Sequence, residues 1–417
     1  MPQEVKRVSK LERLIAELCP DGVPYKTLGE IAIDIFRGAG ITREQVCETG
    51  TPCVRYGEIY TTYGIWFDEC ISHTDETLLT SKKYFEHGDI LFAITGESVE
   101  DIAKSCAYIG NEKCLAGGDI VVLKHNQNPK YLAYALSTMA AQMQKSKGKV
   151  KSKVVHSSVP AIKGIVVPIP PLPVQREIVR ILDNFTELTA ELTAELTAEL
   201  TARRKQYEYY RDELLAAGES TPQIELRNVV RKSCSGATPI KGNSEYYENG
   251  TIPWIRTQDV RFNEIYTVDS YITERAIEET AAKWIPENCV IVAISGASAG
   301  RCAINKIKAT TNQHCLNMEI DDSKALYKYV YYCVTSQYEE LLARKQGARG
   351  DLNSSLILGI KIPVPPLEEQ ARIVSILDHF DTLCNDLTSG LPAEIEARKK
   401  QYEYYRDKLL TFQEAKI

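Results

Sequence analysis

The sequence predicts an α+β protein in which two mixed α/β domains with small twisted sheets are separated by two long antiparallel coiled-coil helices. A pseudo-twofold internal repeat would relate the two halves. Three observations predict this fold: one segment occurs twice, each copy contains an extended helical pattern, and the segments between the copies have a globular composition. The repeat is considered first because it constrains the whole fold.

The repeated segment covers residues 167–215 and 362–410, which match at a constant offset of 195 residues without an insertion. Of the 49 aligned positions, 29 are identical, which chance does not produce. Each copy opens with a proline-rich strand end, at Pro168–Pro171 and Pro363–Pro366. Proline ends the preceding strand and suits the first turn of a helix, so each copy is predicted to start a helix here.

The first helix is predicted to run without interruption from Gln175 to Leu215. Apolar residues recur at helical spacing after the prolines, and the pattern continues through three TAEL units at 189–192, 193–196 and 197–200. Alanine, glutamate and leucine are strong helix formers. At 1.5 Å per residue, such a helix would reach roughly 60 Å.

The second helix is predicted to break or kink at Ser389-Gly390-Leu391-Pro392 and to restart near Pro392. Both helices still carry apolar side chains at matching positions, which form a predicted seam. These positions are Leu188, Leu192, Leu196, Leu200, Leu383, Leu387, Leu391 and Ile395. The simplest partner for each seam is the other copy. The repeat alone leaves open a long coiled coil that acts as a spacer or dimeriser.

The two segments between the helices, about 20–166 and 222–361, are globular in composition and weakly similar to each other. Thr51–Ile59 aligns with Ile252–Val260, and Gly88–Gly96 aligns with Asn288–Gly296. The second pair predicts a buried strand that ends in a glycine turn. Near its end each segment has a predicted helix, 131–145 or 327–345, followed by a polar loop and a strand into the proline motif.

The N-terminal segment Leu11–Leu18, followed by Cys19–Gly22, resembles the helix end at 211–218. This similarity predicts a circular arrangement in which residues 1–20 form a helix that completes the C-terminal half. The remaining predicted parts are a first globular domain, a central helix, a second globular domain and a C-terminal helix. Their predicted boundaries are 21–168, 169–221, 222–363 and 364–417.

Composition narrows the class of protein. The 12 cysteines include no C-x-x-C pair, and the six histidines do not lie at ligand spacing from them, so we expect reduced core cysteines and no metal site or disulfide framework. No apolar run approaches the ~18 residues of a membrane span, and the N-terminus lacks a signal-peptide pattern, which predicts a cytoplasmic protein. A net charge of −6 argues mildly against nucleic-acid binding, but a local basic face is compatible with it.

A catalytic role has one weak indication. Gly296-Ala297-Ser298-Ala299-Gly300 matches the G-x-S-x-G pattern of a nucleophile elbow, which makes a serine hydrolase the remote alternative. An elbow needs a helix after the serine, whereas Arg301–Ile304 has the pattern of a strand. The sequence has no P-loop, no glycine-rich cofactor loop and no [DN]-P-P-[YFW] methyltransferase motif, so we expect a non-enzymatic chain without a cofactor.

The duplicated motif P-x-P-P-L-x-x-Q-x-x-I-V-x-x-L-D, at Pro168–Asp183 and Pro363–Asp378, resembles that of specificity subunits of type I restriction–modification systems. The resemblance covers nearly the whole chain. The TAEL tract and the paired QYEYYRD segments, Gln206–Asp212 and Gln401–Asp407, are similar to one branch of that family.

The resemblance implies two target-recognition domains, each recognising one half of a bipartite target in double-stranded DNA. It implies that the helices set the spacing and dock two modification (methyltransferase) subunits, and that restriction (translocase–nuclease) subunits join the complex. S-adenosylmethionine, ATP and Mg²⁺ would belong to those partners, and no membrane is involved. One TAEL unit adds about 6 Å, or about two base pairs of B-DNA, so the number of units should change the gap between half-sites. The alternative is a coiled-coil scaffold or adaptor without DNA specificity.

Two groups of basic residues are candidates for phosphate contacts. In the first half, lysines alternate after the predicted helix, and in the second half a basic polar loop occupies the corresponding place. The candidates are Lys145, Lys147, Lys149, Lys151 and Lys153, then Arg344, Lys345, Arg349 and Asn353. Alternating lysines on an extended loop can face phosphates together. The competing interpretation is a solvated loop.

The aligned strand–turn elements supply candidates for base contacts. Arg55 and Tyr56 align with Arg256, Thr257 and Gln258. Arginine suits guanine and glutamine suits adenine in the major groove. For each of them an intradomain salt bridge or hydrogen bond is about as plausible.

Two further sets are weaker candidates. Gln313 and His314 form a minor one. The tyrosines of the two QYEYYRD segments follow basic residues, but because they recur on a helix we favour packing or partner docking over base stacking.

Overall fold

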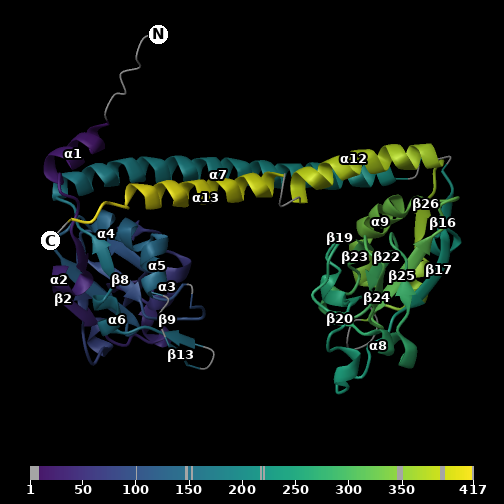
Figure 1. Ribbon diagram of the computed structural model, residues 1–417, viewed down its shortest axis with the longest axis horizontal. Coiled ribbons are helices and arrows are strands. Elements are labelled where there is room, and N and C mark those ends of the chain that lie inside the picture. Colours follow the sequence, from purple (N-terminus) through teal and green to yellow (C-terminus); the bar gives the residue numbers. More distant parts are fainter. Residues whose placement is uncertain are drawn as a thin grey trace, which may run out of the picture. The chain divides into compact units, whose positions relative to one another are not determined.

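The computed structural model describes residues 9–99, 101–145, 149–151, 154–216, 218, 221–344, 351–385 and 390–415. The chain forms two compact units (Figure 1). Unit 1 comprises Met1–Glu195 and Ile395–Ile417, and unit 2 comprises Leu196–Glu394. Each unit holds one globular domain together with segments of the long helices, as the duplicated sequence predicts.

The globular domain of unit 1 contains two five-stranded sheets. The larger one consists, in spatial order, of β2 (Ala32–Arg37), β12 (Ile120–His125), β8 (Ile90–Ala93), β10 (Ser105–Tyr108) and β5 (Trp66–Phe67). The smaller one consists of β3 (Val46–Cys47), β6 (Ser72–Thr74), β4 (Thr51–Val54), β11 (Cys114–Ala116) and β7 (Tyr84–Phe85). Side chains alternate along a strand, so on β8 Phe92 packs in the core with α4 (Pro129–Leu136), while Leu91 packs with the smaller sheet. Because both faces are covered, β8 is apolar throughout.

Unit 2 repeats this arrangement. Its larger sheet is β17 (Val230–Ser235), β25 (Cys315–Ile320), β22 (Val290–Ala293), β23 (Cys302–Asn305) and β19 (Asn263–Ile265). Its smaller sheet is β20 (Tyr271–Ile272), β18 (Ile252–Ile255), β24 (Ala309–Thr311) and β21 (Trp284–Ile285). The larger sheets have the same strand order at equivalent positions, which confirms that the two globular segments share one fold.

Each helix predicted near the end of a globular segment is two helices. The first is α4 followed by α5 (Met139–Lys145), and the second is α9 (Tyr327–Ser336) followed by α10 (Tyr338–Ala343). At the first break, Thr138 Oγ1 donates a hydrogen bond to the carbonyl of Ala135 at 2.8 Å, which competes with helix continuation. The prediction of one helix was therefore wrong.

The long helices agree with the sequence. Helix α7 (Leu172–Leu215) is continuous over 44 residues, including all three TAEL units. The second copy forms α12 (Leu367–Asn385) and α13 (Leu391–Leu409), and the interruption falls at the predicted place. The residues of that interruption from 386 to 389, and with them the seam position Leu387, lie outside the described residues.

Aromatic contacts pair the helices within each unit. In unit 1 the ring of Phe185 on α7 lies 5.6 Å from Tyr402 and 5.9 Å from Tyr405 on α13. In unit 2 the ring of Phe380 on α12 lies 6.4 Å from Tyr207 and 5.9 Å from Tyr210 on α7. The two sets are equivalent in the repeat: Phe185 corresponds to Phe380, and Tyr402 and Tyr405 correspond to Tyr207 and Tyr210. Such an exchange of partners is the pattern that a twofold repeat produces. The other copy is thus the partner of each helix.

The seam is only partly buried. Leu196 and Leu391 are buried, and Leu192, Leu200, Leu383 and Ile395 are half-buried. Leu188, however, is 61% exposed, so its predicted place in the seam was wrong. A four-residue repeat drifts around a helix with 3.6 residues per turn, and the drift turns this leucine outward.

A buried glutamine of the duplicated motif attaches each globular domain to its helix. In unit 1, Gln175 Oε1 accepts from Asn128 N at 3.0 Å, and its Nε2 donates to Pro170 O at 2.7 Å. In unit 2, Gln370 Oε1 accepts from Leu326 N at 2.9 Å, and its Nε2 donates to Pro365 O at 2.8 Å and Lys324 O at 3.2 Å. The motif therefore fixes the first turn of each long helix to a domain loop.

The motif aspartate adds a second attachment. Asp183 accepts from Tyr134 at 2.8 Å and pairs with Lys130 at 2.8 Å in unit 1. Asp378 accepts from Tyr332 at 2.6 Å and pairs with Lys328 at 2.8 Å in unit 2. Both contacts join the long helix to the helix that covers the larger sheet.

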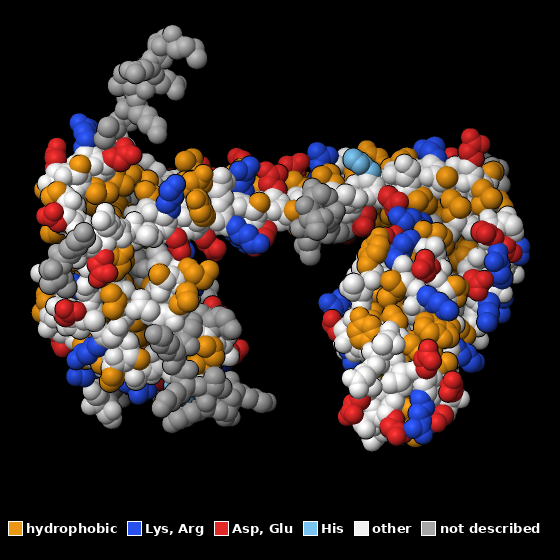
Figure 2. Space-filling model, in the orientation of Figure 1, with side chains coloured by type: hydrophobic (Ala, Val, Ile, Leu, Met, Phe, Trp, Pro, Cys, Tyr) orange, Lys and Arg blue, Asp and Glu red, His pale blue; other side chains and the backbone are white. Residues whose placement is uncertain are grey.

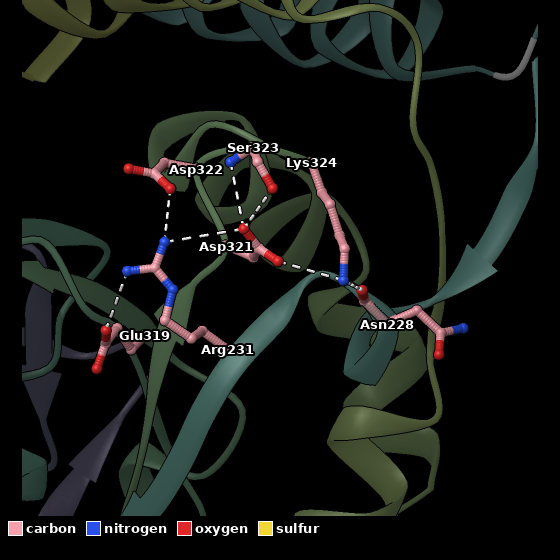
Figure 3. Close-up of polar contacts among 7 residues, drawn as sticks. All are labelled: Asn228, Arg231, Glu319, Asp321, Asp322, Ser323 and Lys324. Atoms are coloured by element: carbon pink, nitrogen blue, oxygen red, sulfur yellow. Dashed lines mark hydrogen bonds and ion pairs between the residues drawn. The ribbon is translucent and has the colours of Figure 1, made fainter.

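In unit 2 an ion-pair network shapes the loop that Gln370 binds. Arg231 on β17 pairs with Asp322 at 2.5 Å and lies 3.5 Å from Glu319 (Figure 3). Lys324 pairs with Asp321 at 3.2 Å, and its ammonium group donates to the carbonyl of Asn228 at 3.2 Å. The network holds residues 321–324 against the start of β17, and it has a structural role.

Helix α1 and the last described residues both lie in unit 1. Helix α1 (Lys10–Leu18) joins the core of unit 1 through Leu11, and Lys10 pairs with buried Glu177 on α7 at 2.8 Å. Val23 N donates to Gln413 O at 2.8 Å, so the C-terminal segment also lies in unit 1. The last residues therefore complete the N-terminal domain, whereas the sequence predicted that the N-terminal helix completes the C-terminal half.

Candidate nucleic-acid interface

A cleft of about 500 Å³ opens beside the end of β4 in unit 1. Strand β4 ends at Val54, and Arg55 precedes the short helix α3 (Tyr56–Thr61). The turn between β11 and β12 forms the other side. The lining residues are Gly40, Ile41, Arg43, Arg55, Tyr56, Gly57, Glu58, Thr61, Gly117, Gly118 and Asp119. The structure thus brings the predicted residues Arg55 and Tyr56 to a concave surface.

Arg55 forms an ion pair within its own domain. Its Nε lies 3.3 Å from Glu58 Oε1, and buried Glu58 also accepts from Arg55 N at 3.0 Å and Ser72 Oγ at 2.7 Å. The side chain of Arg55 is 31% exposed, which leaves part of the guanidinium group at the cleft. The intradomain salt bridge considered from the sequence is therefore present, and it orients the arginine.

The equivalent arginine of unit 2 lacks that partner. Arg256 follows β18, and Asp259, the counterpart of Glu58, is one methylene shorter and accepts only the backbone N–H of Arg256 at 2.8 Å. The Arg256 guanidinium lies 5.8 Å from the ring centroid of Trp254, and its buried Nε has no hydrogen-bond partner among the described residues. Burying an unpaired donor is costly, so Arg256 lacks the intradomain compensation that Glu58 gives Arg55.

Further polar side chains belong to this strand–turn element and to the turn after β24 (Ala309–Thr311), where Asn312 N donates to Ile255 O at 3.0 Å. Thr257 is half-buried and Gln258 is exposed. Gln313 and His314, in the turn between β24 and β25, are exposed, and their Nε2 atoms lie 3.2 Å apart. Thr238 donates to Gln313 Oε1. The turn that holds the two minor sequence candidates therefore lies next to the strand–turn element.

The structure excludes Lys145 from this surface. The side chain is buried, and its ammonium group donates to Leu136 O at 2.7 Å and to Ser105 Oγ at 3.1 Å. Burial lowers the pKa of Lys145 to about 7. The prediction of a phosphate contact was wrong here because the last turn of α5 points this side chain into the core.

The remaining lysines of the series are only partly described. Lys149 and Lys151 lie on β13 (Lys149–Lys151), which pairs with β14 (Val154–His156), and β14 pairs with β9 (Thr95–Gly96). Lys147 and Lys153 lie outside the described residues.

The two described residues of the basic loop predicted in unit 2 make contacts within their own domain. Arg344 forms an ion pair with Glu340. Asn353 caps α11 (Ser354–Leu358), where its Oδ1 accepts from Leu356 N at 2.8 Å. Lys345 and Arg349 lie outside the described residues. The asparagine caps the helix through Oδ1, and its contact with DNA stays a prediction.

One face of the molecule shows how its charged side chains are distributed. Figure 2 shows basic and acidic side chains interspersed over the visible face of both units. A chain of net charge −6 therefore depends on local arginines and lysines for any contact with a polyanion.

The hydrolase alternative fails on geometry. Gly296–Ser298 forms a single 3₁₀ turn, and strand β23 follows it, antiparallel to β22. A nucleophile elbow requires a helix at this place. Ser298 therefore lies in a turn between two strands.

The cysteines mostly have the predicted role. No disulfide joins them, and nine of the twelve are buried. Cys47 is exposed, so it departs from the prediction of core cysteines. Within the described part of the chain, no helix has the length and apolar character to span a membrane.

Comparison with known proteins decides the family. The family model described as the type I restriction modification DNA specificity domain matches residues 20–202 and 223–397. The chain belongs to this family. The matched ranges contain both globular domains, most of α7, all of α12 and the first part of α13.

Curated relatives of the specificity family agree. The EcoR124I/EcoR124II specificity subunit of Escherichia coli is 40% identical over 294 residues, which cover 68% of this chain and 70% of that protein. A putative type I restriction enzyme specificity subunit of Haemophilus influenzae is 37% identical over 277 residues, which cover 64% of this chain and 68% of that protein.

Solved structures show the same fold. A chain from a study of complex assembly and conformational transition of the type I R-M system aligns with a TM-score of 0.70 at 17% identity, covering 94% of this chain and 98% of that one. The HsdS subunit of Thermoanaerobacter tengcongensis aligns with a TM-score of 0.53 at 17% identity, covering 94% and 96%. These likenesses establish the fold of a specificity subunit.

Sequence reasoning missed the functional residues of the specificity-family motif. Gln175, Gln370, Asp183 and Asp378 were visible as repeated polar residues in an apolar helical pattern. That pattern is a usable signal, because a repeated buried glutamine must find hydrogen-bond partners.

Proposed function

We propose that this chain is the DNA-recognition subunit of a type I restriction–modification complex, in which each globular domain recognises one half of a bipartite double-stranded target. The observation that carries the proposal is the equivalent strand–turn element after β4 and β18. In both domains an arginine follows the strand at that place: Arg55 lines the cleft of unit 1, and Arg256 carries a buried Nε without a hydrogen-bond partner among the described residues. Arginine and glutamine are suited to guanine and adenine edges in the major groove.

The long helices would set the distance between half-sites. Helix α7 is continuous over 44 residues, which corresponds to about 66 Å at 1.5 Å per residue. A rigid helix converts residue number into length, as dimer geometry sets half-site spacing in other DNA-binding proteins.

Two modification subunits and the restriction subunits are the proposed partners, and they would supply the chemistry, S-adenosylmethionine, ATP and Mg²⁺. An apolar groove of about 630 Å³ between α7 and α13 offers a docking surface in unit 1. Phe185, Leu188, Tyr405 and Leu409 line it, flanked by Arg180 and Lys408. Exposed apolar surface of this kind is typical of protein interfaces. The complex would act in the cytoplasm, where the chromosome is accessible.

A coiled-coil scaffold without DNA specificity fits less well. A scaffold gives no reason for two domains of one fold to carry an arginine at the same place after equivalent strands. The family match also covers both domains together with α12 and parts of α7 and α13.

The proposal is tested by sequencing methylated adenines in cells with and without this chain and its modification subunits. We expect one split motif that depends on the chain. Arg256→Ala should relax one position of one half-site by roughly 5- to 150-fold, because a bidentate base contact is worth about 1–3 kcal/mol. Arg55→Ala should affect only the other half-site. A motif that is independent of the chain would refute the proposal.

The lysines at 147, 149, 151 and 153 are proposed to contact phosphates. Their joint replacement by alanine should weaken binding to all sequences alike and flatten its salt dependence. Binding curves at several salt concentrations measure this effect. Unchanged curves would remove the loop from the interface.

A further inference from the structure

The cleft in the first domain and its counterpart in the second differ in a systematic way. Backbone hydrogen bonds establish which positions correspond. Gly117 N donates to Val54 O at 2.9 Å in unit 1, and Asn312 N donates to Ile255 O at 3.0 Å in unit 2. Position 117 therefore corresponds to 312, and Arg55 to Arg256.

A second pair of bonds extends the correspondence. Ala39 N donates to Ala116 O at 2.9 Å, and Ala237 N donates to Thr311 O at 2.9 Å. Four glycines of the first domain thus correspond to four hydrogen-bonding side chains of the second. The matched pairs are Gly40 and Thr238, Gly57 and Gln258, Gly117 and Asn312, and Gly118 and Gln313.

Packing accounts for only two of these glycines. A Cβ at Gly117 would lie 2.9 Å from Val54 O, and one at Gly118 would lie 3.2 Å from Gly40 Cα. In contrast, a Cβ at Gly40 or Gly57 would meet nothing within 4 Å, and neither residue has a left-handed φ. Gly57 also lies inside helix α3, where glycine costs conformational entropy. The fold itself therefore gives no reason for glycine at 40 and 57.

What distinguishes Gly40 and Gly57 is their place at the cleft, where the lack of a side chain lets a ligand approach the backbone closely. Both line the 500 Å³ cleft, which also presents Arg43 and Arg55. In the second domain the equivalent positions carry the side chains of Thr238 and Gln258. Gln258 is exposed, and its side chain makes no hydrogen bond to another described residue.

We propose that these matched positions make the two domains recognise different half-sites, with Gly57 and Gln258 as the main determinants. The open cleft lets a base edge reach the backbone at Gly57 and leaves Arg55 as the specific contact, which favours guanine. In the second domain the amide of Gln258 offers a donor and an acceptor, which suits adenine N6 and N7. This inference rests on the proposed function and deepens it.

The test uses the whole chain co-expressed with its modification subunits, and the readout is the methylated-adenine motif of the cell's DNA. Gln258→Gly should relax one position of the second half-site by roughly 5- to 150-fold and leave the first unchanged. Gly57→Gln should reduce methylation at the first half-site at least tenfold or change its sequence. Gly64→Gln is the matched control, because a Cβ at Gly64 also meets nothing within 4 Å and Gly64 does not line the cleft.

Folding is followed in parallel by thermal unfolding. Gly57→Ala should leave the unfolding temperature unchanged or raise it while weakening recognition of the first half-site, which no packing role would produce. Unchanged half-sites in the Gly57 and Gln258 variants, with altered half-sites in Arg55→Ala and Arg256→Ala, would overturn this inference and leave the proposed function standing. An unchanged motif in all of these variants would overturn the proposed function itself.

Discussion

Lys145 shows how one side chain decides between a surface role and a core role. Its ammonium group lies over the ring of Phe92, 5.9 Å from the centroid, and donates a hydrogen bond to Leu136 O at the C-terminal end of α4. Desolvation disfavours the charged form and lowers its pKa to about 7, against 10.5 for the free side chain. The residue therefore titrates near neutral pH in the folded chain.

This titration predicts a pH dependence of stability. Between about pH 7 and pH 10 the unfolded chain binds one more proton than the folded chain, so the free energy of unfolding should rise with pH, by at most about 1.4 kcal/mol per unit. Below pH 7 Lys145 is protonated in both states, so the stability gained at higher pH is absent and the free energy of unfolding no longer depends on pH through this residue. Lys145→Met should flatten the profile, as urea unfolding at pH 6, 7, 8 and 9 would measure. An unchanged slope in the variant would contradict the assignment.

At the scale of elements, the buried glutamine of each motif explains why the proline-rich segment and the long helix recur together. Gln175 joins α7 to the loop before α4 and to Pro170. Gln370 does the same for α12 and the loop before α9. Since each glutamine is buried, its loss leaves buried backbone groups without partners.

Gln175→Met should therefore destabilise unit 1 by about 2–4 kcal/mol, because each buried unsatisfied group costs about 1–3 kcal/mol. Denaturant unfolding measures the loss. Arg176→Ala is the matched control, since Arg176 is the next residue on the same helix and is exposed. Equal stability of the two variants would show that the glutamine is not an anchor.

At the scale of the whole molecule, the sequence predicted the repeat, the two domains, the continuous α7 and the break between α12 and α13. These features depend on local helix propensity and on a repeat that is visible without the structure. The break within 131–145 has side-chain hydrogen bonds from Ser137 to Tyr134 O and from Thr138 to Ala135 O, which an apolar pattern does not reveal. The direction of Lys145 and the partner of Arg55 depend on tertiary packing, so the candidate site was only partly predictable.

The central claim is that two independent recognition domains are held at a distance set by α7. Deleting one TAEL unit, Thr193–Leu196, and sequencing methylated adenines tests it most directly. We expect both half-sites to keep their sequence while the gap between them shortens by about two base pairs, since four residues span about 6 Å. A changed half-site sequence, or an unchanged gap with methylation retained, would contradict the account.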